Sequence, residues 1–314
     1  MSRKVLLQLV LPLIGLSVLF WLLAFAPGDK HHQPALLEMS VILRDGDGNV
    51  SAMRKGMEQA AKDLNVELRF LTPAEDNSAV EQVQLLEHEV SGAAPAILLI
   101  PADREALGEA VSAAAGKTTL VTVESDMTAW GADASISMDH QALGEALGKA
   151  ALNGVPFGGT VLLLDGLPGD NGVRERMEAA KALLEEKGRQ VRIYRWTSDS
   201  TAFANILRIE RPKAVIAFEA AALTEMAELS RGEEAFPLLY GCGSTAGIAA
   251  ALEKGRVTAI AAVNVFSAGY LAVEAAAKLT RHESWTGASS VGFSVVRQET
   301  MYSSDNQKLL FPVT

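Results

Sequence analysis

The chain has 314 residues, which is enough for about two domains. Its 28 Lys and Arg residues against 38 Asp and Glu residues give a net charge of −10, which disfavours nucleic acid as a partner. The single cysteine, Cys242, excludes an intramolecular disulfide and a metal site built from thiolates alone, and we expect it to be a buried apolar thiol.

The N-terminus predicts a membrane segment. Arg3 and Lys4 precede residues 5–26, an uncharged apolar run long enough to cross a bilayer as a helix. Basic residues before the run orient the following chain outside the cytoplasm. We therefore predict an anchor over residues 1–27, and residues 28–36 are predicted to be a linker. A cleaved signal peptide is the alternative, because residues 24–26, Ala-Phe-Ala, resemble a cleavage site, although the length of the run and Pro27 favour an anchor.

From residue 37 onward, short apolar runs alternate with segments of helical periodicity. In chain order, strands are predicted over residues 38–43, 67–71, 96–100, 120–123, 135–138, 160–164, 191–196, 214–217, 237–240 and 259–263. The intervening helices are predicted over residues 51–64, 78–90, 104–114, 141–152, 173–186, 201–210, 221–230, 245–253 and 267–279. Two or three short extended pieces are predicted over residues 289–313.

This alternation predicts an α/β fold with two doubly wound parallel-sheet lobes, each covered by helices on both faces. We place the first lobe at residues 37–139 plus 264–284 and the second at residues 140–263 plus 285–314. Ligands of such sheets bind outside the carboxyl ends of the strands. Polar residues that follow strands are therefore the candidate ligand-binding residues, and we select Asp47, Asn49, Glu124, Ser125, Asp126, Glu219 and Asn264.

Three of these candidates have competing interpretations. Asp47 and Asn49 could instead form a turn that caps the next helix. Together with Asp45 they imitate the start of a calcium loop, but the twelfth position of a loop that begins at Asp45 is Gly56 rather than an acid. Glu219 lies among apolar residues, where a lone charge is costly to bury. Either a cationic ligand or Arg176 could compensate that charge.

Four segments carry a family resemblance. Residues 169–176 read Gly-Asp-Asn-Gly-Val-Arg-Glu-Arg, residues 121–126 Val-Thr-Val-Glu-Ser-Asp, residues 137–140 Ser-Met-Asp-His, and residues 268–272 Ala-Gly-Tyr-Leu-Ala. In the order and spacing that these four segments have along the chain, the sequence resembles the sugar-binding proteins of bacterial ABC transporters, the ribose-binding type in particular. The resemblance implies a type I periplasmic-binding-protein fold with a three-strand hinge, near Asp139, Asn264 and residues 284–290. It also implies that Arg176 grips ligand hydroxyls.

The chain departs from this family where stacking aromatic residues are usual, because residues 48–50 are Gly-Asn-Val. The expected function is a monomeric extracytoplasmic receptor that captures a small polar, sugar-like ligand between its lobes and passes it to an ABC permease. A membrane-anchored sensor that signals to a histidine kinase is the alternative.

An enzyme is the remote third possibility, since neither a nucleophile–base pair nor a nucleotide loop is evident. Residues 241–247, Gly-Cys-Gly-Ser-Thr-Ala-Gly, are expected to form a tight strand-to-helix turn. No cofactor is expected. No metal site is expected either, because the five histidines lack the spacing of metal ligands.

Overall fold

The structure is a computed structural model that describes residues 36–311 except residues 45–46, 168, 233–235 and 288. Its strands are β1 (Leu37–Ile42), β2 (Val66–Leu71), β3 (Ala96–Leu99), β4 (Thr119–Glu124), β5 (Ala134–Ser137), β6 (Thr160–Asp165), β7 (Gln190–Arg195), β8 (Ala214–Ala217), β9 (Leu238–Cys242), β10 (Ala259–Val263) and β11 (Phe293–Val296). Its α-helices are α2 (Asp47–Leu64), α3 (Ala79–Ser91), α4 (Arg104–Ala114), α5 (His140–Leu152), α6 (Asn171–Glu186), α7 (Ser200–Glu210), α8 (Ala220–Leu229), α9 (Ala246–Glu253), α10 (Val265–Thr280) and α11 (Ser304–Leu310).

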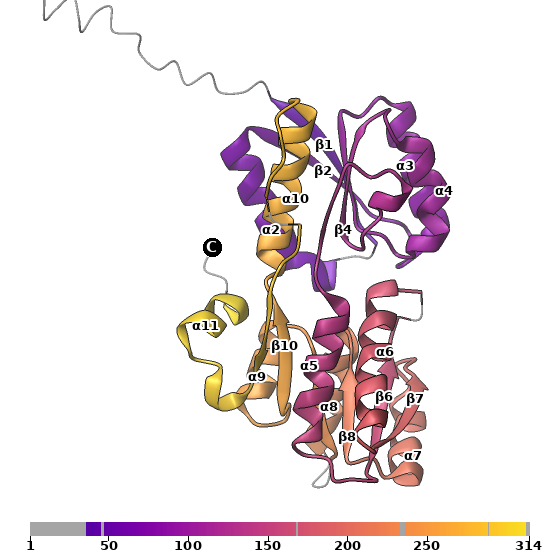
Figure 1. Ribbon diagram of the computed structural model, residues 1–314, viewed down its shortest axis with the longest axis vertical. Helices are drawn as coiled ribbons and strands as arrows, with labels where there is room; N and C mark the ends of the chain where they lie inside the picture. Colours follow the sequence, from indigo (N-terminus) through magenta and orange to yellow (C-terminus); the bar gives the residue numbers. More distant parts are fainter. Residues whose placement is uncertain (1–35, 45–46, 168, 233–235, 288, 312–314) are drawn as a thin grey trace, which may run out of the picture. The chain divides into compact units, whose positions relative to one another are not determined.

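The first lobe contains a five-stranded parallel sheet with the order β2-β1-β3-β4-β5. Its central strand β3 is a continuous apolar run in which every residue is buried, as expected for a strand covered on both faces. Helices α2 and α10 pack together on one face, and α3 and α4 cover the other (Figure 1).

The second lobe contains a six-stranded sheet with the order β11-β10-β9-β8-β6-β7. All of its neighbouring strands are parallel except β11, which runs antiparallel to β10. Helices α5 and α6 cover one face, and α7, α8, α9 and α11 bury apolar residues on the other. The predicted fold class of two α/β lobes with largely parallel sheets is confirmed.

The chain passes between the two sheets three times. It leaves the first sheet after β5 and enters α5, returns from β10 through α10, and crosses again before β11 (Figure 1). A parallel bridge between Ser137 and Ser290 ties two of these crossings together. The exact lobe boundaries stay predictions.

Most predicted elements agree with the structure to within one or two residues, and two differ more. Helix α2 begins at Asp47, four residues before its predicted start, so Asp47 and Asn49 belong to its first turn rather than to a loop. The C-terminal tail was expected to be extended, but beyond β11 it forms α11, whose Asn306 and Leu310 are buried. The predicted membrane segment and linker lie outside the described residues. Among residues 36–311, no described helix is both long and apolar enough to cross a membrane.

Candidate functional site

The carboxyl ends of strands from both sheets border one cavity of about 360 Å³, which we call the strand-end cavity. This volume falls within the range of small-molecule sites, roughly 300–1,000 Å³. Its charged lining residues come from both lobes, and they are Arg44, Lys55, Glu124, Arg176 and Glu219. Met138, Val263, Val265 and Leu310 supply apolar surface.

Arg44 connects the two lobes through this cavity. It follows β1, and its Nη1 lies 3.0 Å from Glu124 Oε2 at the end of β4 and 2.5 Å from Asp170 Oδ2. Asp170 also caps α6, because its Oδ1 accepts a hydrogen bond from the Val173 amide. The Arg44 side chain is only 12% exposed, so this bridge lies largely out of solvent.

Glu124 has an uncommon backbone conformation, with φ +69°. A non-glycine residue in this region is strained, and such strain concentrates at functional sites. The conformation is supported by two hydrogen bonds to its carbonyl oxygen, from Ser137 Oγ at 2.7 Å and from His140 Nε2 at 2.8 Å. Because the strained residue presents its carboxylate to Arg44, the end of β4 is built to hold a charge in the cavity.

Glu219 is buried, and the N-terminus of α8 compensates its charge. Its Oε2 and Oε1 accept hydrogen bonds from the amides of Ala221 at 2.6 Å and Ala222 at 2.5 Å. Burial raises the pKa of Glu219, while these amides and the positive charge of Arg44 oppose that increase. The sequence left a cationic ligand and Arg176 as compensating partners, and the structure adds the helix terminus and Arg44 to them.

Arg176 lies on the second turn of α6 and lines the strand-end cavity. Its Nε donates to the Gly172 carbonyl at 2.9 Å, and its guanidinium lies close enough to hydrogen-bond the Cys242 thiol. Helix α5 approaches this turn so closely that a Cβ at Gly144 would lie 2.1 Å from the Arg176 carbonyl oxygen. The neighbouring Arg174 is exposed.

Cys242 is a free, buried cysteine at the end of β9, and it also lines the strand-end cavity. Burial raises the pKa of its thiol, and Arg176 opposes that shift. The expectation of a buried thiol is confirmed. Residues 241–247 form a strand-to-helix turn in which Gly243 has φ +133° and Thr245 caps α9.

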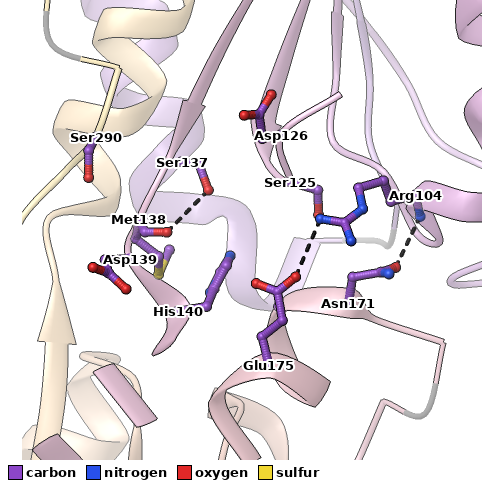
Figure 2. Close-up of a pocket in the computed structure, with 11 residues that line it drawn as sticks. Arg104, Ser125, Asp126, Ser137, Met138, Asp139, His140, Asn171, Glu175 and Ser290 are labelled. Carbon is purple, nitrogen blue, oxygen red and sulfur yellow. Dashed lines mark hydrogen bonds and ion pairs between the residues drawn. The ribbon is translucent and has the colours of Figure 1, made fainter. Parts of the chain in front are cut away.

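A second cavity of about 240 Å³, the crossover cavity, lies beside the chain segment that joins β5 to α5. Figure 2 shows Arg104 of α4 reaching toward Asn171 and Glu175 of α6. The backbone amide of Arg104 donates to Asn171 Oδ1 at 3.2 Å, and the Nη1 of the Arg104 side chain lies 3.3 Å from Glu175 Oε1. The cavity is therefore also lined from both lobes.

The structure brings together some of the eight predicted site residues and separates others. Glu124, Arg176 and Glu219 line the strand-end cavity, whereas Ser125 and Asp126 line the crossover cavity.

Of the remaining three, Asn264 lines neither cavity. Asn264 caps α10 by accepting from the Ser267 amide. Asp47 and Asn49 begin α2, and their side chains lie outside the described part of the chain.

Sequence reasoning did not select Arg44 and Lys55 for the strand-end cavity, or Arg104, His140 and Asn171 for the crossover cavity. Arg44 follows β1 directly, so the rule of polar residues after strands could have found it. Asn171 lies within residues 169–176, but the family resemblance of that segment singles out only Arg176. Arg104 is the first residue of a helix, and no sequence pattern distinguishes it from a solvated position. The described residues hold no group of three or more His, Cys, Asp or Glu side chains placed to bind a metal ion.

Comparisons with known proteins place this architecture in a family. Residues 40–284 match the model of the periplasmic binding protein domain. No curated protein matches the chain.

Solved structures share the fold at low sequence identity. An ABC transporter solute-binding protein from Agrobacterium vitis with bound D-fucose has a TM-score of 0.81 and 19% identity, covering 87% of this chain and 100% of its own. A carbohydrate transporter solute-binding protein from Agrobacterium radiobacter in complex with D-arabinose has a TM-score of 0.82 and 17% identity, covering 88% and 99%. A chain of the XylFII–LytSN complex has a TM-score of 0.77 and 17% identity, covering 85% and 99%. Because the family model matches residues 40–284, the chain belongs to the periplasmic binding protein domain family.

Proposed function

We propose that the protein is an extracytoplasmic solute receptor that captures a small, sugar-like ligand in the strand-end cavity and delivers it to an ABC importer. The observation that carries this proposal is the convergence of Arg44, Glu124, Arg176 and Glu219, from both lobes, on one cavity of about 360 Å³. Two structures of the same fold contain D-fucose and D-arabinose, which supports a sugar as the ligand class. The predicted segment at residues 1–27 would hold the receptor at the membrane.

The lining residues suit hydroxyl groups. Arginine donates several hydrogen bonds in a planar fork, and carboxylates accept hydrogen bonds from hydroxyls. No aromatic side chain is among the residues that line the cavity in the described chain. The apolar face of the sugar would instead contact Met138, Val263 and Val265. We therefore expect a sugar that presents one aliphatic face and several equatorial or axial hydroxyls to the charged residues.

The test is the affinity of two arginine variants on the same helix. Arg176→Ala removes a charged donor from the cavity, and Arg174→Ala removes an exposed arginine two residues away. Losing a hydrogen bond to a charged group costs about 1.5–3 kcal/mol, which corresponds to roughly 10- to 150-fold in the dissociation constant. Calorimetric titration with a sugar that the wild type binds should show that loss of affinity for Arg176→Ala and almost none for Arg174→Ala. Equal affinities would refute the site.

The receptor role also implies that the ligand leaves unchanged. Family membership favours a binding protein over an enzyme. Incubation of the full chain with its ligand, followed by mass spectrometry, should return the ligand intact. A new product that is missing in the Arg176→Ala sample would instead indicate catalysis in the strand-end cavity.

A second candidate function is ligand sensing through a protein partner, and it is favoured by the similarity in fold to a chain of the XylFII–LytSN complex. Transport and sensing predict different phenotypes. Deleting the gene should abolish uptake of the radiolabelled ligand if the protein serves an importer. Unchanged uptake together with a lost transcriptional response to the ligand would favour the sensor.

A further inference from the structure

The crossover cavity concentrates buried polar atoms that lack partners. Four buried side-chain nitrogen or oxygen atoms have no hydrogen-bond partner among the described residues. Three of them, Arg104 Nε, His140 Nδ1 and Asn171 Nδ2, belong to residues that line this one cavity. An unsatisfied buried polar group is destabilising, and such groups are rare in folded proteins. Because these three residues line the same cavity, their unpartnered atoms indicate a binding site for a polar ligand.

The hydrogen bond of His140 determines what its free nitrogen offers. Nε2 lies 2.8 Å from the Glu124 carbonyl oxygen, which can only accept, so Nε2 carries a proton. Burial, and secondly the charge of Arg176, lower the pKa of His140, which favours the neutral ring. In the neutral ring Nδ1 is an acceptor. His140 is 7% exposed, so solvent reaches this nitrogen poorly.

The other two free atoms are donors. Asn171 is 3% exposed, and its Oδ1 already accepts from the Arg104 amide at 3.2 Å, which fixes the orientation of its Nδ2 group. The guanidinium of Arg104 lies 5.8 Å from the Trp130 ring centre and contacts Glu175 through Nη1, so its Nε is held in place. The site thus offers two oriented donors and one acceptor.

A glycine lets these groups meet. A Cβ at Gly172 would lie 2.6 Å from His140 Cε1 and 3.1 Å from its Nδ1. Only glycine therefore allows the imidazole to lie against the first turn of α6, where Asn171 begins the helix. The packing brings the His140 acceptor next to the turn that carries the Asn171 donor.

The charges around the cavity restrict the ligand. Asp126, Asp139 and Glu175 line it against a single cation, Arg104, which disfavours an anion. An ammonium group could not satisfy Asn171 Nδ2 or Arg104 Nε, because it has no acceptor. A metal ion is disfavoured as well, since no cluster of metal-binding side chains is present among the described residues. A hydroxyl group both donates and accepts, so neighbouring hydroxyls match all three atoms.

We propose that the crossover cavity is a second ligand site that binds a small neutral polyol of about three or four carbons through Arg104, His140 and Asn171. The cavity of about 240 Å³ is smaller than the strand-end cavity, and Met138 lines both. This site does not depend on the function proposed for the strand-end cavity. A molecule with so few atoms is expected to bind with a dissociation constant on the order of 1 mM.

The test follows the side-chain amide of Asn171 during a titration with erythritol. In proton–nitrogen correlation spectra of the ¹⁵N-labelled full chain, the Asn171 amide signals are identified as those missing from Asn171→Asp. That variant retains an oxygen for the Arg104 amide, but it removes the donor and adds a negative charge. We expect the Asn171 signals to shift saturably in the wild type. The apparent affinity for erythritol, measured from the shift of melting temperature with erythritol concentration, should be at least tenfold lower in Asn171→Asp than in the wild type.

Controls separate this site from alternatives. Asn205→Asp makes the same chemical change on an exposed position of α7 and should leave erythritol binding intact. Lys55→Ala should also leave it intact, because Lys55 lines the strand-end cavity and not the crossover cavity. Acetate and ethylamine should produce no saturable shift. Failure of the Asn171 signals to shift, loss of erythritol binding in Lys55→Ala, or saturable binding of acetate or ethylamine would each overturn the proposal.

Discussion

The bridge that Arg44 makes between the lobes allows a quantitative prediction. The guanidinium contacts Glu124 of the first lobe at 3.0 Å and Asp170 of the second at 2.5 Å. The Arg44→Met variant keeps much of the apolar stem and removes the charge. It leaves two carboxylates, 20% and 6% exposed, facing each other without their shared cation.

The expected loss can be bounded from burial. Breaking a fully buried ion pair costs about 3–5 kcal/mol, and an exposed pair is worth about 0–1 kcal/mol. The Arg44 pairs are largely but not fully buried, so we expect the free energy of unfolding to fall by about 2–3 kcal/mol. Arg54→Met is the matched control, because Arg54 pairs with Glu58 at 3.1 Å on the surface of α2, with side chains 40% and 54% exposed. Because Arg54 also lies 4.1 Å from the centre of the Phe70 ring, this variant should lose about 1 kcal/mol or less.

Urea unfolding at pH 7.5, followed by circular dichroism, measures both variants. The double variant Arg44→Met/Glu124→Gln should recover part of the loss, since it removes one of the uncompensated carboxylates. If Arg44→Met were as stable as Arg54→Met, the bridge would contribute nothing in solution. The role assigned to Arg44 in holding the two lobes together would then be wrong.

Three further predictions concern other positions. Burial lowers the folded-state pKa of His140, so below about pH 6.5 the unfolded state binds the proton more readily than the folded state. The stability contributed by the neutral ring is therefore present above that pH and is lost as the pH falls. In urea melts, the difference in free energy of unfolding between wild type and His140→Asn should narrow from pH 7.5 to pH 5.5. Gly144→Ala should destabilise by about 1–3 kcal/mol and weaken sugar binding, since its Cβ would lie 2.1 Å from the Arg176 carbonyl; unchanged stability and affinity would contradict that packing. The Cys242 thiol, buried and with a raised pKa, should react with a disulfide reagent at pH 8 much more slowly in the folded chain than after denaturation, and equal rates would contradict its burial.

The fold could be predicted well from the sequence because its strands are buried on both faces. Runs such as Ala214–Ala217 and Ala259–Val263 are uniformly apolar and have the same bounds in the structure as in the prediction. The less accurate predictions lie at the start of α2 and in the tail. Strand β11 is followed by a short helix rather than by further extended segments, because Leu310 packs into an apolar core cluster of the second lobe and the buried Asn306 donates to the Thr300 carbonyl at 2.9 Å.

The candidate site was predicted only in part, for a physical reason. A polar residue after a parallel strand can face a ligand or cap the following helix, and both roles need the same residue types. Asn264 is a cap, whereas Glu219 caps α8 and lines the strand-end cavity at once. Sequence alone does not separate these roles. Nor does it reveal Arg44 as the link between lobes, because its partner Asp170 lies 126 residues away.

The most direct test of the receptor function is a thermal melt of the full chain against a panel of pentoses, hexoses, polyols, nucleosides and amino acids. A ligand that binds only the native state stabilises it by about 2.7 kcal/mol at 100 times its dissociation constant. For a chain of this size, that stabilisation should raise the melting temperature by roughly 5–10 °C. We expect such a shift with at least one sugar, and its loss in Arg176→Ala. An unchanged melting temperature with every compound in the panel would contradict a small-molecule receptor.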